Sequence, residues 1–104
     1  MTSTIGNVSI NKKADIYFAG KCVSHTVHLP DGSRKSVGVI FPAKLTFKTA
    51  ERELMEIVGG KCRIKLAGDA DWRSCNAGDS FEVPANSSFD IETLETVDYV
   101  CHFG

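Results

Sequence analysis

Apolar and polar residues alternate along much of the chain. In residues 61–66 the basic side chains face one way and the apolar side chains the other, and residues 89–92 alternate in the same manner. The odd-numbered positions of residues 97–101 are apolar or aromatic and share one face. No stretch of a dozen residues follows the 3.6-residue period of an amphipathic helix. The pattern therefore predicts a chain built from β-strands.

Turn-forming residues divide these strands at short intervals. A Pro-Asp-Gly-Ser sequence at 30–33 predicts a hairpin loop, Gly59 with Gly60 predicts a tight turn, and residues 68–74 read as a polar connection. The strands expected between such signals span residues 21–28, 34–41, 44–49, 53–58, 61–66 and 80–83. With the later segments added, roughly nine short strands in one domain predict an all-β jelly-roll sandwich or small barrel.

The composition agrees with this fold class. Val, Ile and Thr together number 23, whereas Leu and Met number 7, and β-branched side chains favour the pleated surface of a sheet. With 104 residues, the chain has room for one domain. We expect residues 1–14 to form a loose arm or an edge strand, because they are polar and include Lys12 and Lys13, and residues 15–104 to form the domain.

Charge and patterning exclude several classes of partner. The formal net charge is −1, from 12 basic and 13 acidic residues, so no broad positive field favours nucleic acid or an anionic membrane. No apolar run approaches the ~20 residues that span a bilayer, and the N-terminus lacks the apolar segment of a signal peptide. The four cysteines form no Cys-x-x-Cys pair, so we expect reduced thiols in a cytoplasmic protein.

Two spaced motifs make the sequence more specific. The first is Glu53 followed by six residues and Gly60, and the second is the pattern Gly-x5-Pro-x-Asn-x2-Phe over residues 78–89. In this order they resemble the two motifs of the cupin superfamily. Proline fixes φ at the entry to a turn, and Asn86 tolerates the left-handed region at a position where cupins usually carry glycine. The resemblance implies a single-domain cupin with the jelly-roll fold.

The ligand set of metal-binding cupins is incomplete in this chain. Such cupins carry two histidines shortly before the glutamate and a third in the second motif, but here residues 45–49 are Leu-Thr-Phe-Lys-Thr and Phe89 holds the other position. Glu53 alone does not make a transition-metal site. His25 and His28 lie three apart on one strand, so we expect their rings to diverge. We therefore expect no metal and no cofactor.

A closer resemblance extends from about Asp15 to Gly104. It rests on five segments in order: YFAGKCVS at 17–24, SVGV at 36–39, ELM at 53–55, AGDSFEVP at 77–84 and YVC at 99–101. These segments resemble the pyrimidine/purine nucleoside phosphorylase family of small single-domain bacterial cupins. The resemblance implies a pentosyltransferase of broad specificity that converts purine and pyrimidine nucleosides and phosphate to free base and α-D-ribose 1-phosphate. It further implies a homodimeric cytoplasmic enzyme.

Glu53 is the candidate catalytic residue for such a reaction. Positive charge develops on the sugar as the bond to the base breaks, and a nearby carboxylate stabilises that charge. Glu53 shares a strand face with Met55 and Ile57, so we expect it to point into the barrel. The alternative is that Glu53 lies at the entry of the strand and pairs with a lysine.

Basic and hydroxyl side chains are the candidates for binding phosphate. They are Lys21, Ser24, Arg34, Lys35 and Ser36. The planar guanidinium of Arg34 suits phosphate, and Arg34, Ser36 and Gly38 share one strand face, with Gly38 expected to leave room for a ligand. The alternative is a hairpin with a solvated basic end.

Aromatic side chains are the candidates for stacking on the base. Phe81, Phe89 and Tyr99 are expected on the inner face of the barrel. The alternative is that these rings only fill the core. The cysteines have no evident base partner in the sequence, so a thiolate nucleophile is not expected.

Two other functions stay open from the residues alone. A metal-free cupin that binds a nucleoside or a sugar as a sensor, without turnover, would lack the same metal ligands. A metal-dependent isomerase or dioxygenase is disfavoured by the missing histidines. Phosphate-dependent release of base separates the enzyme from the sensor.

Overall fold

The computed structural model describes residues 3–104, and these residues form eleven strands and one short 3-10 turn, η1 (Phe18–Gly20). The strands are β1 (Ser9–Ile10), β2 (Asp15–Tyr17), β3 (Cys22–His28), β4 (Arg34–Ile40), β5 (Lys44–Lys48), β6 (Glu53–Gly59), β7 (Lys61–Leu66), β8 (Arg73–Asn76), β9 (Ser80–Val83), β10 (Ser88–Thr93) and β11 (Val97–Phe103). The chain is therefore nearly all β, as the alternating pattern predicts.

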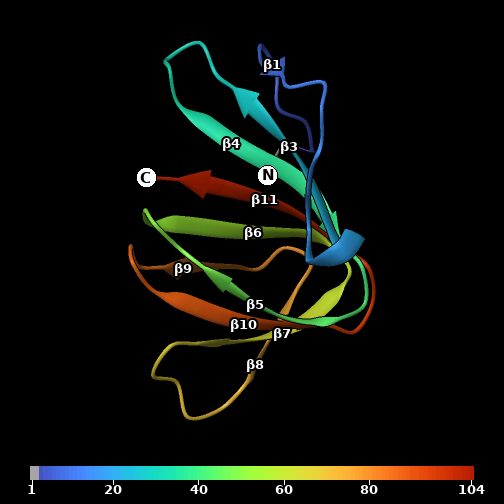
Figure 1. Cartoon of the computed structure of the whole chain (residues 1–104), viewed down its shortest axis with the longest axis vertical. Helices are drawn as coiled ribbons and strands as arrows, with labels where there is room; N and C mark the ends of the chain where they lie inside the picture. The colour runs from blue at the N-terminus through green and yellow to red at the C-terminus, as the bar shows by residue number, and fades with distance from the viewer. Residues whose placement is uncertain (1–2) are drawn as a thin grey trace.

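The strands form two sheets that pack face to face (Figure 1). Sheet A has the order β1-β3-β4-β11-β6-β9, with β2 also paired to β3, and sheet B has the order β5-β10-β7-β8. From β4 to β7 the chain passes from one sheet to the other at each connection, and it does so again from β8 to β11. This alternation between two antiparallel sheets is the jelly-roll arrangement, and the chain is a cupin-like β-sandwich.

The core lies between the two sheets, because alternate residues of each strand face inward. From sheet A it takes Cys22, Ile40, Met55, Ile57, Phe81, Val83, Val97, Tyr99 and Cys101. From sheet B it takes Cys62, Ile64, Cys75, Phe89 and Ile91, with Leu45, Phe47 and Leu66 packed against them. The four cysteines are free and buried.

Positive-φ residues stand at the turns that the sequence signals. Gly60 has a φ of +86°, and a Cβ added there would lie 2.3 Å from the carbonyl oxygen of Thr96, so no other residue fits without a shift. Asn86 has a φ of +54°, in the left-handed region that its position in the second motif predicts. The loop at 30–33 closes through a hydrogen bond from Leu29 N to Ser33 O.

Three short strands lack a clear sequence signal. Every residue of β1 and β2 is exposed, so these segments have no buried face and their sequences show no alternation of apolar and polar residues. β8 begins inside the predicted polar connection, where a single buried residue, Cys75, faces the core. These strands exist because neighbouring strands offer free backbone groups for pairing.

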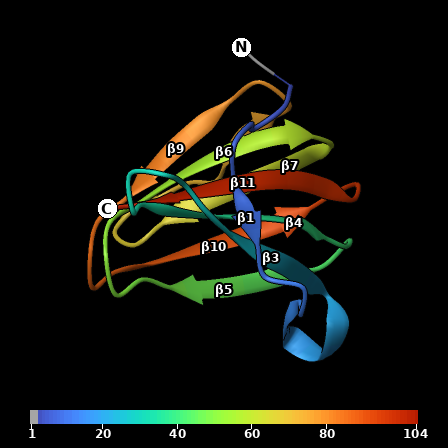
Figure 2. The same ribbon diagram turned by 90° about the horizontal axis from the view of Figure 1, so that it is seen from above.

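The N-terminal segment lies across the outer face of sheet A. Residues 1 and 2 of the predicted arm lie outside the described residues, while β1 pairs with β3 and so forms an edge strand. Figure 2 looks onto this segment as it crosses the sheet. A groove of about 890 Å³ lies beneath it, lined on the sheet side by Val37, Val58 and Val100 among others. The domain boundary after residue 14 stays a prediction. Within residues 3–104, no helix is long and apolar enough to cross a membrane.

Candidate active site on the inner face of sheet A

Four adjacent strands of sheet A bring most of the predicted site residues together. Ser24 of β3 pairs with Gly38 of β4, Ser36 of β4 pairs with Cys101 of β11, and Phe103 of β11 pairs with Glu53 of β6. Because side chains alternate between the two faces of a sheet, these positions point to the same, inner face. A row of candidate side chains therefore crosses strands that lie far apart in the sequence.

Glu53 is half-buried at the start of β6, between β9 and β11. Burial raises the pKa of its carboxyl above the usual 4.5, because the charged form loses hydration. The Cys101 thiol lowers this pKa through a side-chain hydrogen bond, the charge of Glu51 raises it, and the charge of Arg34 lowers it. Glu53 is thus a desolvated carboxyl group with a cation in reach, which agrees with the inward orientation that the alternation predicts.

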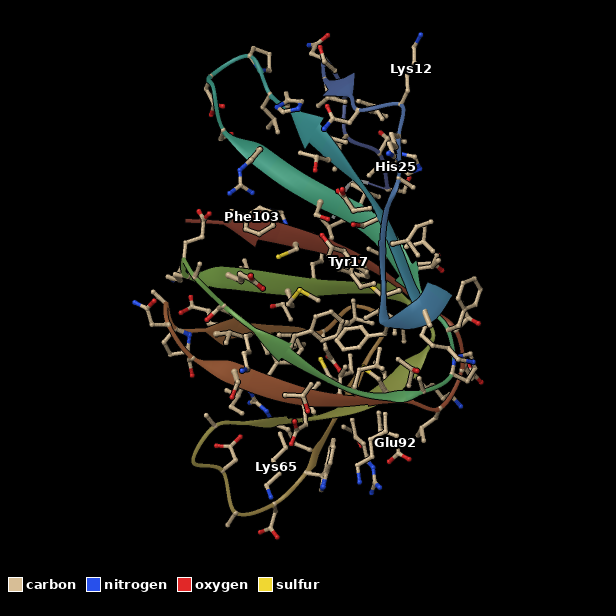
Figure 3. The ribbon with its side chains drawn as sticks, viewed as in Figure 1. Lys12, Tyr17, His25, Lys65, Glu92 and Phe103 are labelled. Carbon is tan, nitrogen blue, oxygen red and sulfur yellow. The ribbon has the colours of Figure 1, made fainter. Side chains whose placement is uncertain are left out.

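Arg34 is held in place by two contacts. Its Nη2 donates a hydrogen bond to Oε2 of Glu51 at 2.5 Å, and its guanidinium carbon lies 4.2 Å above the ring centroid of Phe103. Figure 3 labels Phe103 toward the C-terminal end of β11. The cation stacks on the aromatic face while its edge stays free for hydrogen bonds. Arg34 therefore presents a partly exposed guanidinium on the face of sheet A that also carries Glu53.

The hydroxyl groups of Ser24, Ser36 and Tyr99 form the deeper part of the row. Tyr99 is buried, its hydroxyl lies 3.5 Å from Sγ of Cys22, and both serines lie close enough to influence its pKa. Burial raises the pKa of Tyr99 well above 10, so its hydroxyl keeps its proton at neutral pH. Ser24 is 1% exposed, which places it in the wall of the site.

Gly38 has a different role from the expected one. A Cβ at this position would lie 2.2 Å from the carbonyl oxygen of Val23 and 2.8 Å from Cβ of Ser24. The space beside Gly38 is therefore filled by β3 and is not open to a ligand. Gly38 stands between Ser24 and Tyr99 in the strand register, so its missing side chain lets these two residues approach each other.

Two basic candidates lie apart from the row. Lys21 precedes β3, whereas Arg34 pairs with His28 at the other end of that strand, so the two are separated by roughly 20 Å of extended backbone. Lys35 pairs with His102 and lines the groove on the outer face of sheet A. The structure does not bring Lys21 or Lys35 to Glu53.

The aromatic candidates of the second motif lie in the core. Phe81 and Phe89 contact each other edge to face at 5.2 Å, and Phe89 stacks on Phe47 at 5.3 Å. Phe18 of η1, which is 42% exposed, contacts Phe47 at 5.1 Å and completes a row of four rings that reaches the surface. Phe18 also has a positive φ of 52°, an unusual conformation for a bulky residue.

Sequence reasoning missed Glu51, Phe103 and the role of Cys101. Glu51 stands two residues before Glu53, but nothing in the sequence shows that it contacts Arg34. Cys101 has no base partner in the sequence because its partner, Glu53, comes from the neighbouring strand. Only the pairing of β4, β11 and β6 reveals these contacts.

The histidines have partners outside this row. His102 Nε2 lies 2.9 Å from Oε1 of Glu56 on the outer face, and His25 and His28 both hydrogen-bond to Asn11 through different atoms. The two rings on β3 thus meet at one residue of the N-terminal segment, although they stand three positions apart. No cluster of three or more potential metal ligands occurs among residues 3–104.

The groove on the outer face shares one side chain with this row, that of Tyr99, and is otherwise lined by different side chains. It is lined by Val37, Val58, His25 and Glu56 among others, and neither Glu53 nor Arg34 lines it. The side chains of Glu53, Arg34 and the two serines point to the opposite face of the sheet. The inner row carries the side chains that the sequence predicts for the site, so it is the candidate active site.

Comparisons with known proteins agree on one family. The model of a family described as pyrimidine/purine nucleoside phosphorylase matches residues 12–103. A protein of that name from Cupriavidus taiwanensis is 63% identical over 101 residues, covering 97% of this chain and 96% of its own length. Another from Herminiimonas arsenicoxydans is 60% identical over 103 residues, covering 99% of both chains. The crystal structure of a protein of unknown function from Acinetobacter sp. ADP1 superposes with a TM-score of 0.97 at 47% identity, covering 99% of this chain and all of its own.

Proposed function

Because the chain belongs to the pyrimidine/purine nucleoside phosphorylase family, we propose that it is a nucleoside phosphorylase of broad specificity. Its substrates are purine or pyrimidine nucleosides and inorganic phosphate, and its products are the free base and α-D-ribose 1-phosphate. The relatives that carry this name match the chain over nearly its whole length, so the activity belongs to this single domain.

One structural observation supports this function most directly. A guanidinium group and a desolvated carboxyl group, Arg34 and Glu53, share the inner face of sheet A near each other. Phosphorolysis needs a cation for the attacking phosphate and an anion for the positive charge on the sugar. A site with both signs of charge supplies both.

In the proposed reaction, a phosphate oxygen attacks C1′ of the ribose and the C1′–N bond to the base breaks. The electron pair of that bond leaves with the base, which takes up a proton, and the new C1′–O bond gives ribose 1-phosphate. Arg34 holds the phosphate, with a hydrogen bond from Ser36, and the buried Ser24 and Tyr99 form the wall of the site beyond Ser36. The carboxylate of Glu53 stabilises the positive charge that develops on the sugar ring.

The base would lie toward the row of aromatic rings. Phe47, which is partly buried, is backed by Phe89, and Phe81 braces Phe89 from its edge. Phe81 and Phe89 are buried and have a supporting role. The contact with the base falls to the outer end of the row, Phe47 and Phe18, because stacking needs an accessible ring. Stacking of this kind tolerates many bases, which fits broad specificity.

An assay with and without phosphate tests this function. The purified protein is incubated with uridine, and separately with adenosine, and the free base is measured. We expect release of base that depends on phosphate and an equal amount of ribose 1-phosphate. Binding of nucleoside with no release in the presence of phosphate would instead show a sensor, and release without phosphate would show a hydrolase.

We propose that the outer face of sheet A binds a second copy of the chain. Val37 and Val58 are 36% and 47% exposed there, and the same face carries Lys35 together with Glu56 and Asp98. A surface with both charges beside apolar residues is complementary to itself across a two-fold axis. Light scattering at micromolar concentration should give a dimer mass, and V58D should give a monomer. A monomer mass for the unchanged protein would overturn this proposal.

We also propose that the protein works in the cytoplasm. Four buried free cysteines suit a reducing compartment. Cell fractionation should recover the protein with cytoplasmic markers, and recovery with periplasmic markers would contradict this.

A further inference from the structure

Glu51 is the acidic partner of Arg34 and lies in the turn between β5 and β6. Its Oε2 accepts a hydrogen bond from Arg34 Nη2 at 2.5 Å, at the edge of the guanidinium that the Phe103 ring leaves free. Phosphate would use this same edge, because planar hydrogen bonding to a guanidinium is directed along its N–H groups. A carboxylate of the chain therefore holds the cation that the proposed function gives to phosphate.

This ion pair is placed where it can open. The side chains of Arg34 and Glu51 are both 45% exposed, and exposed ion pairs between single charges are weak because water screens and competes for them. Glu51 stands in a turn and not in a strand, so its side chain can turn to the solvent without disturbing the sheet. Phosphate carries more charge than a carboxylate and offers more acceptor oxygens.

The negative charge of Glu53 also favours the release of Glu51 from Arg34 when phosphate binds. Glu51 lies close enough for its charge to raise the pKa of Glu53. A phosphate that joined Arg34 while Glu51 stayed would place three acidic groups around one cation. If Glu51 moves away when phosphate binds, only two acidic groups, Glu53 and phosphate, remain around Arg34.

We propose that Glu51 competes with phosphate for Arg34, holding the guanidinium in position while the site is empty and releasing it when phosphate binds. This inference rests on the proposed function. It makes Glu51 a specificity-determining residue, because a weakly binding monoanion does not displace a carboxylate that is already paired. Glu51 thereby lowers the affinity for phosphate. Arg34 keeps its orientation during the exchange because its guanidinium stays stacked on Phe103.

Calorimetric titration of inorganic phosphate, without nucleoside and at constant ionic strength, tests the competition. E51Q keeps the size of the side chain and removes its charge, so phosphate should bind roughly 3- to 10-fold more tightly than to the unchanged protein. The matched control is E82Q, because Glu82 pairs with Arg52, and not with Arg34, in an exposed ion pair of the same 2.5 Å length. E82Q should change phosphate affinity less than twofold.

A second measurement separates competition from support. In steady-state assays, E51Q should lower the KM for phosphate and leave the KM for nucleoside within about twofold. If E51Q binds phosphate more weakly or equally, Glu51 positions Arg34 and does not compete, and the proposal is wrong. R34Q should lose phosphate binding; if it binds phosphate as the unchanged protein does, the anion site is elsewhere and the proposal also fails.

These outcomes distinguish this inference from the proposed function. Phosphate-dependent release of base with no gain of affinity in E51Q would leave the function intact and overturn the competition. Absence of phosphate-dependent release in the unchanged protein would overturn the function, whatever the calorimetry of E51Q shows.

Discussion

Cys101 of β11 lies diagonally across from Glu53 of β6 on the inner face of sheet A, and its thiol lowers the pKa of the Glu53 carboxyl. Cys101 is buried, and burial raises the pKa of its thiol far above the usual 9, so it serves as a donor and not as a nucleophile. The contact makes the ionised form of Glu53 easier to keep in a desolvated place. Catalysis by the proposed mechanism depends on that ionised form.

Removing the charge of Glu53 should lower activity without unfolding the protein. E53Q keeps shape and hydrogen-bonding capacity, so loss of charge stabilisation alone should lower kcat/KM by roughly 10²-fold or more, about 3 kcal/mol of barrier. If Glu53 only positions ribose, KM should change and kcat should not. Steady-state phosphorolysis measures both. Full activity of E53Q would contradict the catalytic role.

The same variant should be more stable than the unchanged protein at neutral pH. The pKa of Glu53 is raised in the fold, so the protonated form stabilises the fold below pH 4.5, and this contribution is lost as pH rises through the raised pKa. E53Q stays neutral throughout. Its melting temperature minus that of the unchanged protein should be near zero at pH 4 and positive at pH 7. A difference that does not depend on pH would show that Glu53 is not desolvated.

Removing the Cys101 donor should move the pH dependence of activity. In the proposed mechanism the ionised Glu53 is the active form, so kcat/KM should fall as pH drops through its raised pKa. C101A removes the thiol that lowers this pKa, and the acid limb of the pH profile should therefore move to higher pH. C101S keeps a donor and is the matched control, with a limb close to that of the unchanged protein. Equal shifts in both variants would assign the effect to packing.

Gly60 should tolerate alanine less well than Gly32. Both glycines have a positive φ, +86° and +89°, so each substitution costs about 1–2 kcal/mol for the left-handed backbone. A Cβ at Gly60 would also collide with the carbonyl oxygen of Thr96, whereas a Cβ at Gly32 meets nothing within 4 Å. G60A should lose about 1–3 kcal/mol more than G32A. Urea unfolding of both variants measures the difference, and equal losses would contradict the close approach.

Chelation should leave activity unchanged. In the described part of the chain, residues 3–104, no cluster of potential ligands accompanies Glu53, and its neighbours Cys101 and Arg34 are a high-pKa thiol and a cation. Elemental analysis of the active protein should therefore find no stoichiometric transition metal. Exhaustive chelation should not lower kcat. Loss of activity that one added metal restores would overturn the metal-free mechanism.

The sequence by itself determined most of the strands that form the sandwich, with β1, β2 and β8 as the exceptions. Alternation over residues 61–66 and 89–92 reflects a period of two, which is a local property of a strand with one buried face. The turn residues are local as well, since a positive φ at Gly60 or Asn86 depends on the side chain at that position. The inward face of Glu53 follows from the same alternation.

Only the tertiary structure decided which of the candidate residues meet. Arg34 and Glu51 stand 17 positions apart, and Glu53 and Cys101 come from strands whose pairing depends on the whole sheet order. Sheet order is set by the burial of both sheets against each other, which is not a local property. For this reason Lys21 and Arg34 are equal candidates for phosphate in the sequence, although in the sheet they lie near opposite ends of β3. The contact between Glu51 and Arg34 likewise has no signal in the sequence.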